Sequence, residues 1–360
     1  MMSAASEENQ YFWKEGFANI NNPFFQVLCD KQSYSMGEKV NPTTVAFYIV
    51  PLINAMIRVG TMEEKDRLFR AFINGMEKIP SNKRGAKGTL EYIAVESARE
   101  CTNAKAHQDK AKQEIVSRLE AKIEKNGLLD NKILFIRLED DDDFPAELNG
   151  LVAMQLATKY NRPTIVARLN EEGYIRGSAR GLNQSELKSF KNFLGESGFF
   201  EYTIGHDNAF GASIPNANLK KFHTYANEFL ENYDFGDNVY EVEFERSAYD
   251  KDIKDIIFDL ANYVDIWGQM NSEPLIAVKN IVVRASDIQC IGKNSDTLKI
   301  EKNGITYIKF FARSLIQDLK QFPEVSLTVV GTANLNTWMG HTTPQIFIKD
   351  IDIKDGALAF

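Results

Sequence analysis

Cysteine is scarce in this chain of 360 residues. The three cysteines, Cys29, Cys101 and Cys290, lie far apart and follow no metal-ligand spacing. This pattern argues against a disulfide framework and against a cysteine-based zinc site. It suits a protein of a reducing, cytoplasmic compartment.

Long apolar runs are missing as well. The longest, residues 45–57, is interrupted by Pro51 and Asn54, and we expect it to be too short to cross a bilayer. Residues 1–14 contain no apolar stretch of the kind that signal peptides carry. We therefore expect a soluble protein without a membrane partner.

Positive charge is in deficit, with 42 Lys and Arg against 50 Asp and Glu and a net charge of −8. This balance argues against indiscriminate binding to nucleic acid. The deficit is uneven, because residues 274–360 carry 10 basic against 8 acidic side chains. Any grip on nucleic acid must come from local basic clusters.

The first third of the chain reads as helical. Residues 41–60 carry apolar side chains at helical spacing, with a kink or restart expected at Pro51. Asn54 and Arg58 are four residues apart and share one edge of that helix. Residues 91–127 form a second predicted helix, with a C-terminal cap at Gly127 and a buried stripe of Ile115, Leu119 and Ile123.

From residue 132 the pattern becomes α/β, which predicts a compact domain with a mixed sheet. Strands are expected at 132–138, 163–169, 174–180, up to 214 and at 239–245, and helices at 150–160, 183–194 and 217–233. The acidic run at 139–143 offers oxygen ligands for a cation. A solvated loop is the better interpretation, because adjacent carboxylates repel each other.

The last region reads as all-β. A helix at 249–264 and a turn-rich linker at 266–274 precede strands at 275–284, 297–301, 305–311, 325–331 and 345–353. A helix at 312–320 falls between the third and fourth strands, which is typical of an OB-fold. OB-folds bind single strands through basic grooves and aromatic stacking, and Trp338 is the best stacking candidate. The predicted segments are thus 1–128, 129–246, 247–273 and 274–360.

Two short stretches have the chemistry of a phosphate site. Ser178 and Arg180 end a predicted strand, and a hydroxyl with a guanidinium can bind a phosphate monoester through charge-assisted hydrogen bonds. The alternative is a solvated edge strand. Gly205 and His206 open the second stretch, where glycine permits close approach of a ligand and histidine can donate to phosphate. A purely structural turn is the alternative there.

These stretches resemble a known family. The pattern Gly205-His206-x-x-Ala209-x-Gly211 resembles the Gly-Gly-His-x-x-Ala-x-Gly signature of the DHH-associated domain, with Ile204 in place of the first glycine. Residues 177–180 resemble its Gly-Ser-Gly-Arg motif. Residues 51–58 resemble Pro-Arg-Leu-Asn-Ala-Ala-Gly-Arg, with Ile57 in place of the glycine, and 266–274 resemble the linker before the final domain. Together they point to the RecJ-like single-strand-specific DNA exonucleases of the DHH phosphoesterase superfamily.

The resemblance implies a DHH-associated α/β domain at 129–246, a helical connector before it and an OB-fold after it. It implies that the chain is the nucleic-acid-binding portion of a 5′-to-3′ single-stranded DNA exonuclease active in repair and recombination. The residues implied to face nucleic acid are Asn54, Arg58, Ser178, Arg180, Gly205 and His206, with His206 lining the active site.

The Asp-His-His motif of the family's catalytic core has no match, since none of the four histidines follows an aspartate. We therefore expect no catalytic residue and no metal site in this chain, with Mn²⁺ or Mg²⁺ bound by a core that the chain lacks. The expected partners are single-stranded DNA with a 5′ phosphate, such a core, or a replication or repair protein. The alternative is a stand-alone, non-catalytic protein that binds single strands or a nuclease.

Overall fold

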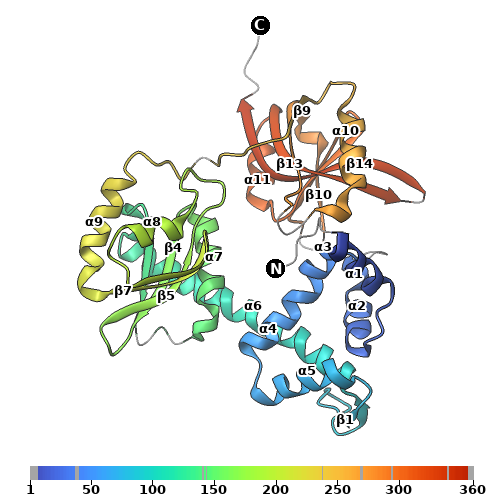
Figure 1. Cartoon of the computed structure of the whole chain (residues 1–360). Helices are drawn as coiled ribbons and strands as arrows, with labels where there is room; N and C mark the ends of the chain where they lie inside the picture. The colour runs from blue at the N-terminus through green and yellow to red at the C-terminus, as the bar shows by residue number, and fades with distance from the viewer. Residues whose placement is uncertain are drawn as a thin grey trace. The chain divides into compact units, whose positions relative to one another are not determined.

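The computed structural model of the chain describes residues 7–36, 40–139, 142, 144–236, 238–267, 271–292, 295–338 and 340–355 (Figure 1). Its contacts divide it into two compact units. One takes residues 1–18, 41–43 and 240–360, and the other takes 19–40 and 44–239. The division of the chain into four segments, which the sequence suggested, remains a prediction.

A helical part occupies the first half of the second unit. It is built from α2 (Pro23–Met36), the π-helix Val45–Ile49, α4 (Val50–Val59), α5 (Met62–Asn74) and α6 (Ile93–Lys125). Phe24, Leu28, Met56, Ile93 and other apolar side chains from these helices form one buried cluster. A short hairpin of β1 (Lys78–Pro80) and β2 (Leu90–Tyr92), which the sequence did not suggest, separates α5 from α6.

The irregularity expected at Pro51 is confirmed. The N–H of Val50 donates to the oxygen of Val45, the i to i−5 bond of a π-helix, and α4 begins there. Proline has no N–H to donate and its ring crowds the carbonyl of the preceding turn, so a wider turn before it relieves both problems.

The same helical stretch corrects one expectation. With the short α3 (Pro42–Thr44) it runs from Pro42 to Val59, which is 18 residues with a mean hydropathy of 1.4. By length and composition alone it is long enough to cross a membrane, and 22% of it is buried inside the structure. Core helices of soluble proteins meet the same criterion.

Helix α6 is about 50 Å long at 1.5 Å per residue. The expected stripe of Ile115, Leu119 and Ile123 is buried, and Gly127 follows the helix in the left-handed conformation with φ +60°. This stripe packs against β3 (Leu134–Leu138) and α7 (Asn149–Tyr160), so α6 belongs to both the helical part and the α/β part.

The α/β part is a mixed sheet, as expected, but its fifth strand, β6 (Tyr202–His206), was not predicted. Its order is β3-β4-β5-β7-β6, with β3 and β4 parallel and the other neighbours antiparallel. The further strands are β4 (Thr164–Leu169), β5 (Tyr174–Arg180), β6 (Tyr202–His206) and β7 (Ala209–Pro215). One face packs against α6 and α7, and the other packs against α8 (Phe190–Glu196) and α9 (Leu219–Phe229).

Two predicted elements of this part are wrong. The helix expected at 183–194 begins only at Phe190, because Ser189 caps it by accepting from the N–H of Asn192. The strand expected at 239–245 does not join this sheet. Instead β8 (Phe244–Ser247) belongs to the other unit, where it pairs in parallel with β9 (Leu275–Arg284). This pairing joins segments far apart in the chain, and local sequence does not encode it.

The C-terminal sheet has the order β10-β11-β12-β14-β13-β9-β8. All five expected strands are present, as β9 (Leu275–Arg284), β11 (Thr297–Lys302), β12 (Ile305–Lys309), β13 (Glu324–Trp338) and β14 (His341–Asp355). The short β10 (Ile288–Ile291) is additional, and the predicted helix is α11 (Arg313–Leu319). Helix α10 (Ile253–Asn262) places Ile253 and Ile257 in the core of this unit. Helix α1 (Glu7–Ala18) belongs to the same unit.

A buried ionic network holds the β1–β2 hairpin to α6. Glu96 is 1% exposed and accepts from the guanidinium of Arg99 and from the N–H of Asn82 at 3.1 Å. Arg99 also pairs with Glu91 of β2, and the pKa of Glu91 is lowered to about 2 by this hydrogen bond. Removing the one cation would leave two carboxylates without their counterion.

We therefore predict that Arg99→Ala lowers the free energy of unfolding by about 3–5 kcal/mol, the usual cost of a buried charge left unpaired. Urea unfolding at neutral pH measures this change. The matched control is Lys110→Ala, since Lys110 is exposed and lies 3.9 Å from Glu114, and it should change stability by less than about 0.5 kcal/mol. Equal effects of the two substitutions would contradict a structural role for the network.

Candidate nucleic-acid interface

The candidate site lies on one face of the five-stranded sheet. In β5 the side chains of Ile175 and Ala179 enter the core under α8 and α9. Side chains alternate along a strand, so Ser178 and Arg180 point to the opposite face, where α7 packs. Ser178 pairs with Val166, whose side chain belongs to the cluster on the α7 side.

Strand register brings His206 to the same face. Arg180 pairs with Ala209 of β7, and Ala209 pairs with His206 of β6. Residues directly opposite each other in a sheet project to the same side. The exposed His206 therefore lies two strands from Arg180, about 10 Å across at the usual spacing.

The small residues of the signature have a physical role in this arrangement. Ala209 lies between His206 and Arg180, and Gly211 lies between Ile204 and Ser178. A methyl group and a hydrogen leave the surface low between the two outer rows of side chains. The spacing His-x-x-Ala-x-Gly thus leaves a strip of small side chains over β7, called the trough below.

Gly205 has a structural explanation. Its φ is +142°, and a Cβ there would lie 2.8 Å from the oxygen of Ala209 and 2.8 Å from the Cα of Phe210. The glycine is therefore required by the β6–β7 hairpin itself. The turn at the tip, Asp207 and Asn208, bonds to the segment before α8, where Ser189 Oγ donates to Asp207 Oδ1 at 2.8 Å.

Arg180 lies between the sheet and the start of α7. A Cβ on Gly150, the second residue of α7, would lie 2.4 Å from Arg180 Nη2, so the absence of a side chain there makes room for the guanidinium. Arg180 Nη1 donates to the oxygen of Ala179 at 2.7 Å. Neither Arg180 nor Arg58 has a carboxylate partner among the residues that the structure describes.

Arg58 comes from a different element but reaches the same place. Helix α4 contacts the turn Ala146–Leu148 that precedes α7, and Val59 packs into the cluster beneath it. Burial lowers the pKa of Arg180, and the nearby positive charge of Arg58 lowers it further. The two arginines, 122 positions apart, are thus close enough to repel each other. Asn54, half-buried, lies one turn before Arg58 on α4.

The first turn of α7 adds two residues that sequence reasoning missed. Asn149 is 4% exposed, and its Oδ1 has no hydrogen-bond partner within the described part of the chain. Gly150 makes room for Arg180, as described above. The only signal in the sequence is a glycine in the first turn of a predicted helix, which by itself is weak evidence.

Other predicted features lie elsewhere. Trp338 ends β13, and its side chain is outside the described residues. In the acidic run, Asp140, Asp141 and Asp143 are also outside them. Burial alone would raise the pKa of Asp142, but hydrogen bonds from Lys122 at 2.9 Å and from the N–H of Glu139 lower it. Asp142 is therefore a structural ion-pair partner.

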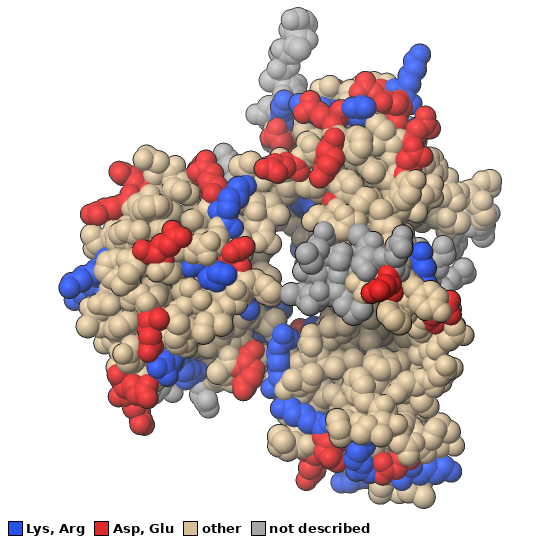
Figure 2. Space-filling model, in the orientation of Figure 1, with Lys and Arg blue, Asp and Glu red and all other residues tan. Residues whose placement is uncertain are grey.

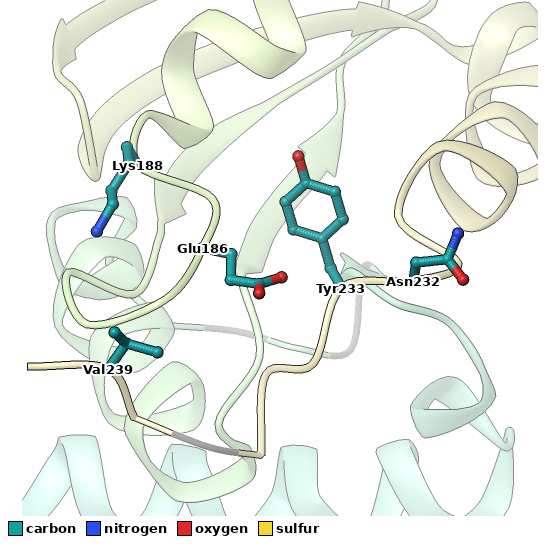
Figure 3. A pocket seen from close by; sticks show the side chains of 5 residues that line it. All are labelled: Glu186, Lys188, Asn232, Tyr233 and Val239. Carbon is teal, nitrogen blue, oxygen red and sulfur yellow. The ribbon is translucent and has the colours of Figure 1, made fainter.

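No group of three or more His, Cys, Asp or Glu side chains within the described ranges is arranged to hold a metal ion. A hollow of about 530 Å³ lies near α9, lined by Glu186, Lys188, Asn232, Tyr233 and Val239 (Figure 3). None of the predicted site residues lines it. Tyr233, which does line it, packs on the apolar cluster at the α8 and α9 face of the sheet. The hollow is separate from the trough.

Comparison with known proteins supports this architecture. Residues 249–350 match the family model of the RecJ OB domain. A Bacillus subtilis (strain 168) prophage protein, provisionally named single-strand DNA-specific exonuclease YorK, is 34% identical over 96% of this chain. The single-stranded-DNA-specific exonuclease RecJ of the same organism is 23% identical over 90% of it. The chain spans 61% of the length of the first protein and 38% of the second.

Solved structures agree in fold. RecJ from Thermus thermophilus in complex with Mn²⁺ superimposes with a TM-score of 0.62 at 18% identity, over 96% of this chain and 46% of that one. Its complex with Mg²⁺ gives a TM-score of 0.57 over 95% of this chain and 48% of that one. The chain is RecJ-like, with a helical and α/β part of RecJ fold followed by a RecJ OB domain.

Proposed function

We propose that the chain grips the 5′-phosphorylated end of single-stranded DNA and serves as the nucleic-acid-binding portion of a RecJ-like 5′-to-3′ exonuclease. The observation that carries the proposal is the closeness of Arg58 and Arg180, two cations without a described carboxylate partner. Two like charges in a partly dehydrated site repel each other until an anion lies between them.

The chemistry favours a terminal phosphate over an internal one. A phosphate monoester carries up to two negative charges, whereas an internal phosphodiester carries one. Two guanidinium groups can each donate paired hydrogen bonds to such a group, and the Ser178 hydroxyl is available on the same face. The low trough over Ala209 and Gly211, with His206 at its far side, gives the first nucleotide room to lie on the sheet.

The second half of the proposal concerns catalysis. The relatives are named as exonucleases, and the RecJ structures hold Mn²⁺ or Mg²⁺. The described residues of this chain do not fit such an ion, so we derive no chemical step through it. We propose that a metal-bearing phosphoesterase core, separate from the described residues, hydrolyses the phosphodiester while this chain holds the strand.

The uncovered apolar side of the helical part supports a partner surface of this kind. Met62, Phe69 and Ile73 recur along one side of α5, and Met76 follows in the turn after the helix. Each of the four is at least 55% exposed. On α4, Val50 and Ile57 are 41% and 56% exposed. Much of the helical part in view carries no charged side chains (Figure 2). Apolar surface of this extent is typical of a protein contact.

We predict that Arg180→Ala weakens binding of 5′-phosphorylated single-stranded DNA by about 10- to 100-fold, the value of one or two charge-assisted hydrogen bonds. Binding of the same strand with a 5′ hydroxyl should change by less than about threefold. Fluorescence anisotropy with the two strands measures both. The control is Arg176→Ala, on the same strand and face, because Arg176 pairs with Glu172 and Glu201. Equal losses of affinity for the 5′-phosphate strand and the 5′-hydroxyl strand would contradict the role assigned to Arg180.

Gly150→Ala should displace the guanidinium of Arg180 without unfolding the protein. The new methyl would lie 2.4 Å from Nη2, at the flexible end of a side chain. Alanine favours the helix by up to about 1 kcal/mol over glycine, so we expect a several-fold loss of 5′-phosphate affinity with an unchanged or higher melting temperature. Gly16→Ala is the control, since a Cβ added there would meet no atom within 4 Å apart from its own helix backbone. Full affinity in Gly150→Ala would contradict the placement of Arg180 at the site.

A third test separates binding from cleavage. Purified chain, mixed with 5′-phosphorylated single-stranded DNA and Mn²⁺, is expected to bind the strand and leave it intact. Gel electrophoresis of the DNA and anisotropy on the same sample give both results. Degradation that persists through stringent purification would contradict the separate core and indicate a metal site outside the described residues.

A further inference from the structure

Two adjacent phenylalanines stand exposed where β12 ends in the OB domain. Phe310 is 54% exposed and Phe311 is 90% exposed, directly before α11. Isolated apolar side chains on a surface are common and need no explanation. Two consecutive aromatic rings at a strand end are less usual, and the backbone of one of them is strained.

Phe311 adopts a left-handed backbone conformation with φ +54°. This region is uncommon for residues other than glycine and is an outlier for a bulky side chain. The N–H of the next residue, Ala312, donates to the oxygen of Asp296 at 2.7 Å, which holds the turn in place. Because the Phe311 ring is almost fully exposed, packing inside the protein does not compensate the strain. Backbone strain that no packing contact offsets points to a functional role.

Phe310, the residue before Phe311, lies against the outer face of the sheet. Its ring centroid lies 5.5 Å from that of Phe347, with 56° between the planes. Phe347 pairs with Ile308 of β12 and with Thr332 of β13. The neighbours of Phe347 along β14, Ile346 and Ile348, enter the core, so Phe347 projects outward.

Positive charge lies beside these rings. Lys349 follows Phe347 by two positions in β14 and is exposed, at the point where the pairing of β14 with β13 shifts register. Lys309, directly before Phe310, donates from Nζ to the oxygen of Lys349 at 2.6 Å. Aromatic rings next to lysines are the combination that single-strand-binding surfaces use, with bases stacked on rings and phosphates near the cations.

We propose that Phe311, with Phe310 beside it, is a stacking platform for unpaired bases of single-stranded DNA. The proposal rests on the proposed function, because the ligand is the same strand whose 5′ end the sheet of the other unit grips. It differs from the sequence-based choice of Trp338, and it assigns base contacts to residues that the phosphate site does not include. Stacking makes these contacts tolerant of sequence, as a nuclease that travels along a strand requires.

The test compares an oligothymidylate of about 20 nucleotides, longer than the site of one OB-fold, with an abasic strand of the same length and 5′ end. Phe311→Gly should weaken oligothymidylate binding about 5- to 150-fold, as expected for the loss of one stacked base. It should leave abasic binding unchanged. Phe311→Tyr keeps the ring and should bind normally.

Stability separates a binding role from a structural one. Glycine adopts the left-handed conformation without steric cost, so the melting temperature of Phe311→Gly should not fall. Phe322→Ala, in the same domain, is the control and should not affect binding. Unchanged oligothymidylate binding in Phe311→Gly, or an equal loss on the abasic strand, would overturn the platform.

The outcomes also distinguish the two proposals. If wild-type protein discriminates 5′ phosphate from 5′ hydroxyl while Phe311→Gly binds normally, only the platform is wrong. If the wild-type chain binds no single strand at all, the proposed function and the platform are both wrong.

Discussion

The repulsion between Arg58 and Arg180 is the constraint around which the candidate site is built. A folded chain with a net charge of −8 has many carboxylates with which to neutralise two arginines, yet none of those described pairs with either. Burial makes the charge of Arg180 more costly, and Arg58 adds to that cost. The contact of α4 with the turn before α7 holds Arg58 near Arg180, and in the function proposed above a terminal phosphate would complement the two charges.

The sheet beneath the arginines has small residues where a ligand would lie. Ala209 and Gly211 occupy the central positions of the face, and Gly150 leaves space for the guanidinium at the start of α7. Each substitution toward a larger side chain would fill the trough or move Arg180. Gly205, in contrast, serves the close packing of the β6–β7 hairpin, because a Cβ there would lie 2.8 Å from the backbone of β7.

In the two proposals made above, the two units would serve different kinds of recognition. The α/β part offers a charged pair suited to one terminal group, whereas the OB domain offers exposed rings suited to any unpaired base. A strand held at its end by charge and along its length by stacking can be bound without reading its sequence. In these proposals the excess of acidic residues elsewhere would limit binding to these local surfaces, since a negative protein repels the phosphate backbone outside them.

The sequence by itself determined the elements whose causes are local. Apolar alternation predicted the strands of the OB domain, and Pro51 predicted the break that the π-helix provides. The motif residues of the α/β domain, Ser178, Arg180 and His206, were also chosen from sequence, but their common face was not.

Tertiary structure decided what depends on partners distant in the chain. Strand order and register bring His206 and Arg180 to one side of the sheet, and the packing of α4 brings Arg58 to Arg180. The pairing of β8 with β9 and the exposure of Phe311 depend in the same way on contacts that form only when the sheets assemble. Local propensity acts over a few residues, whereas these choices depend on contacts between residues far apart in the chain, up to the 122 positions between Arg58 and Arg180.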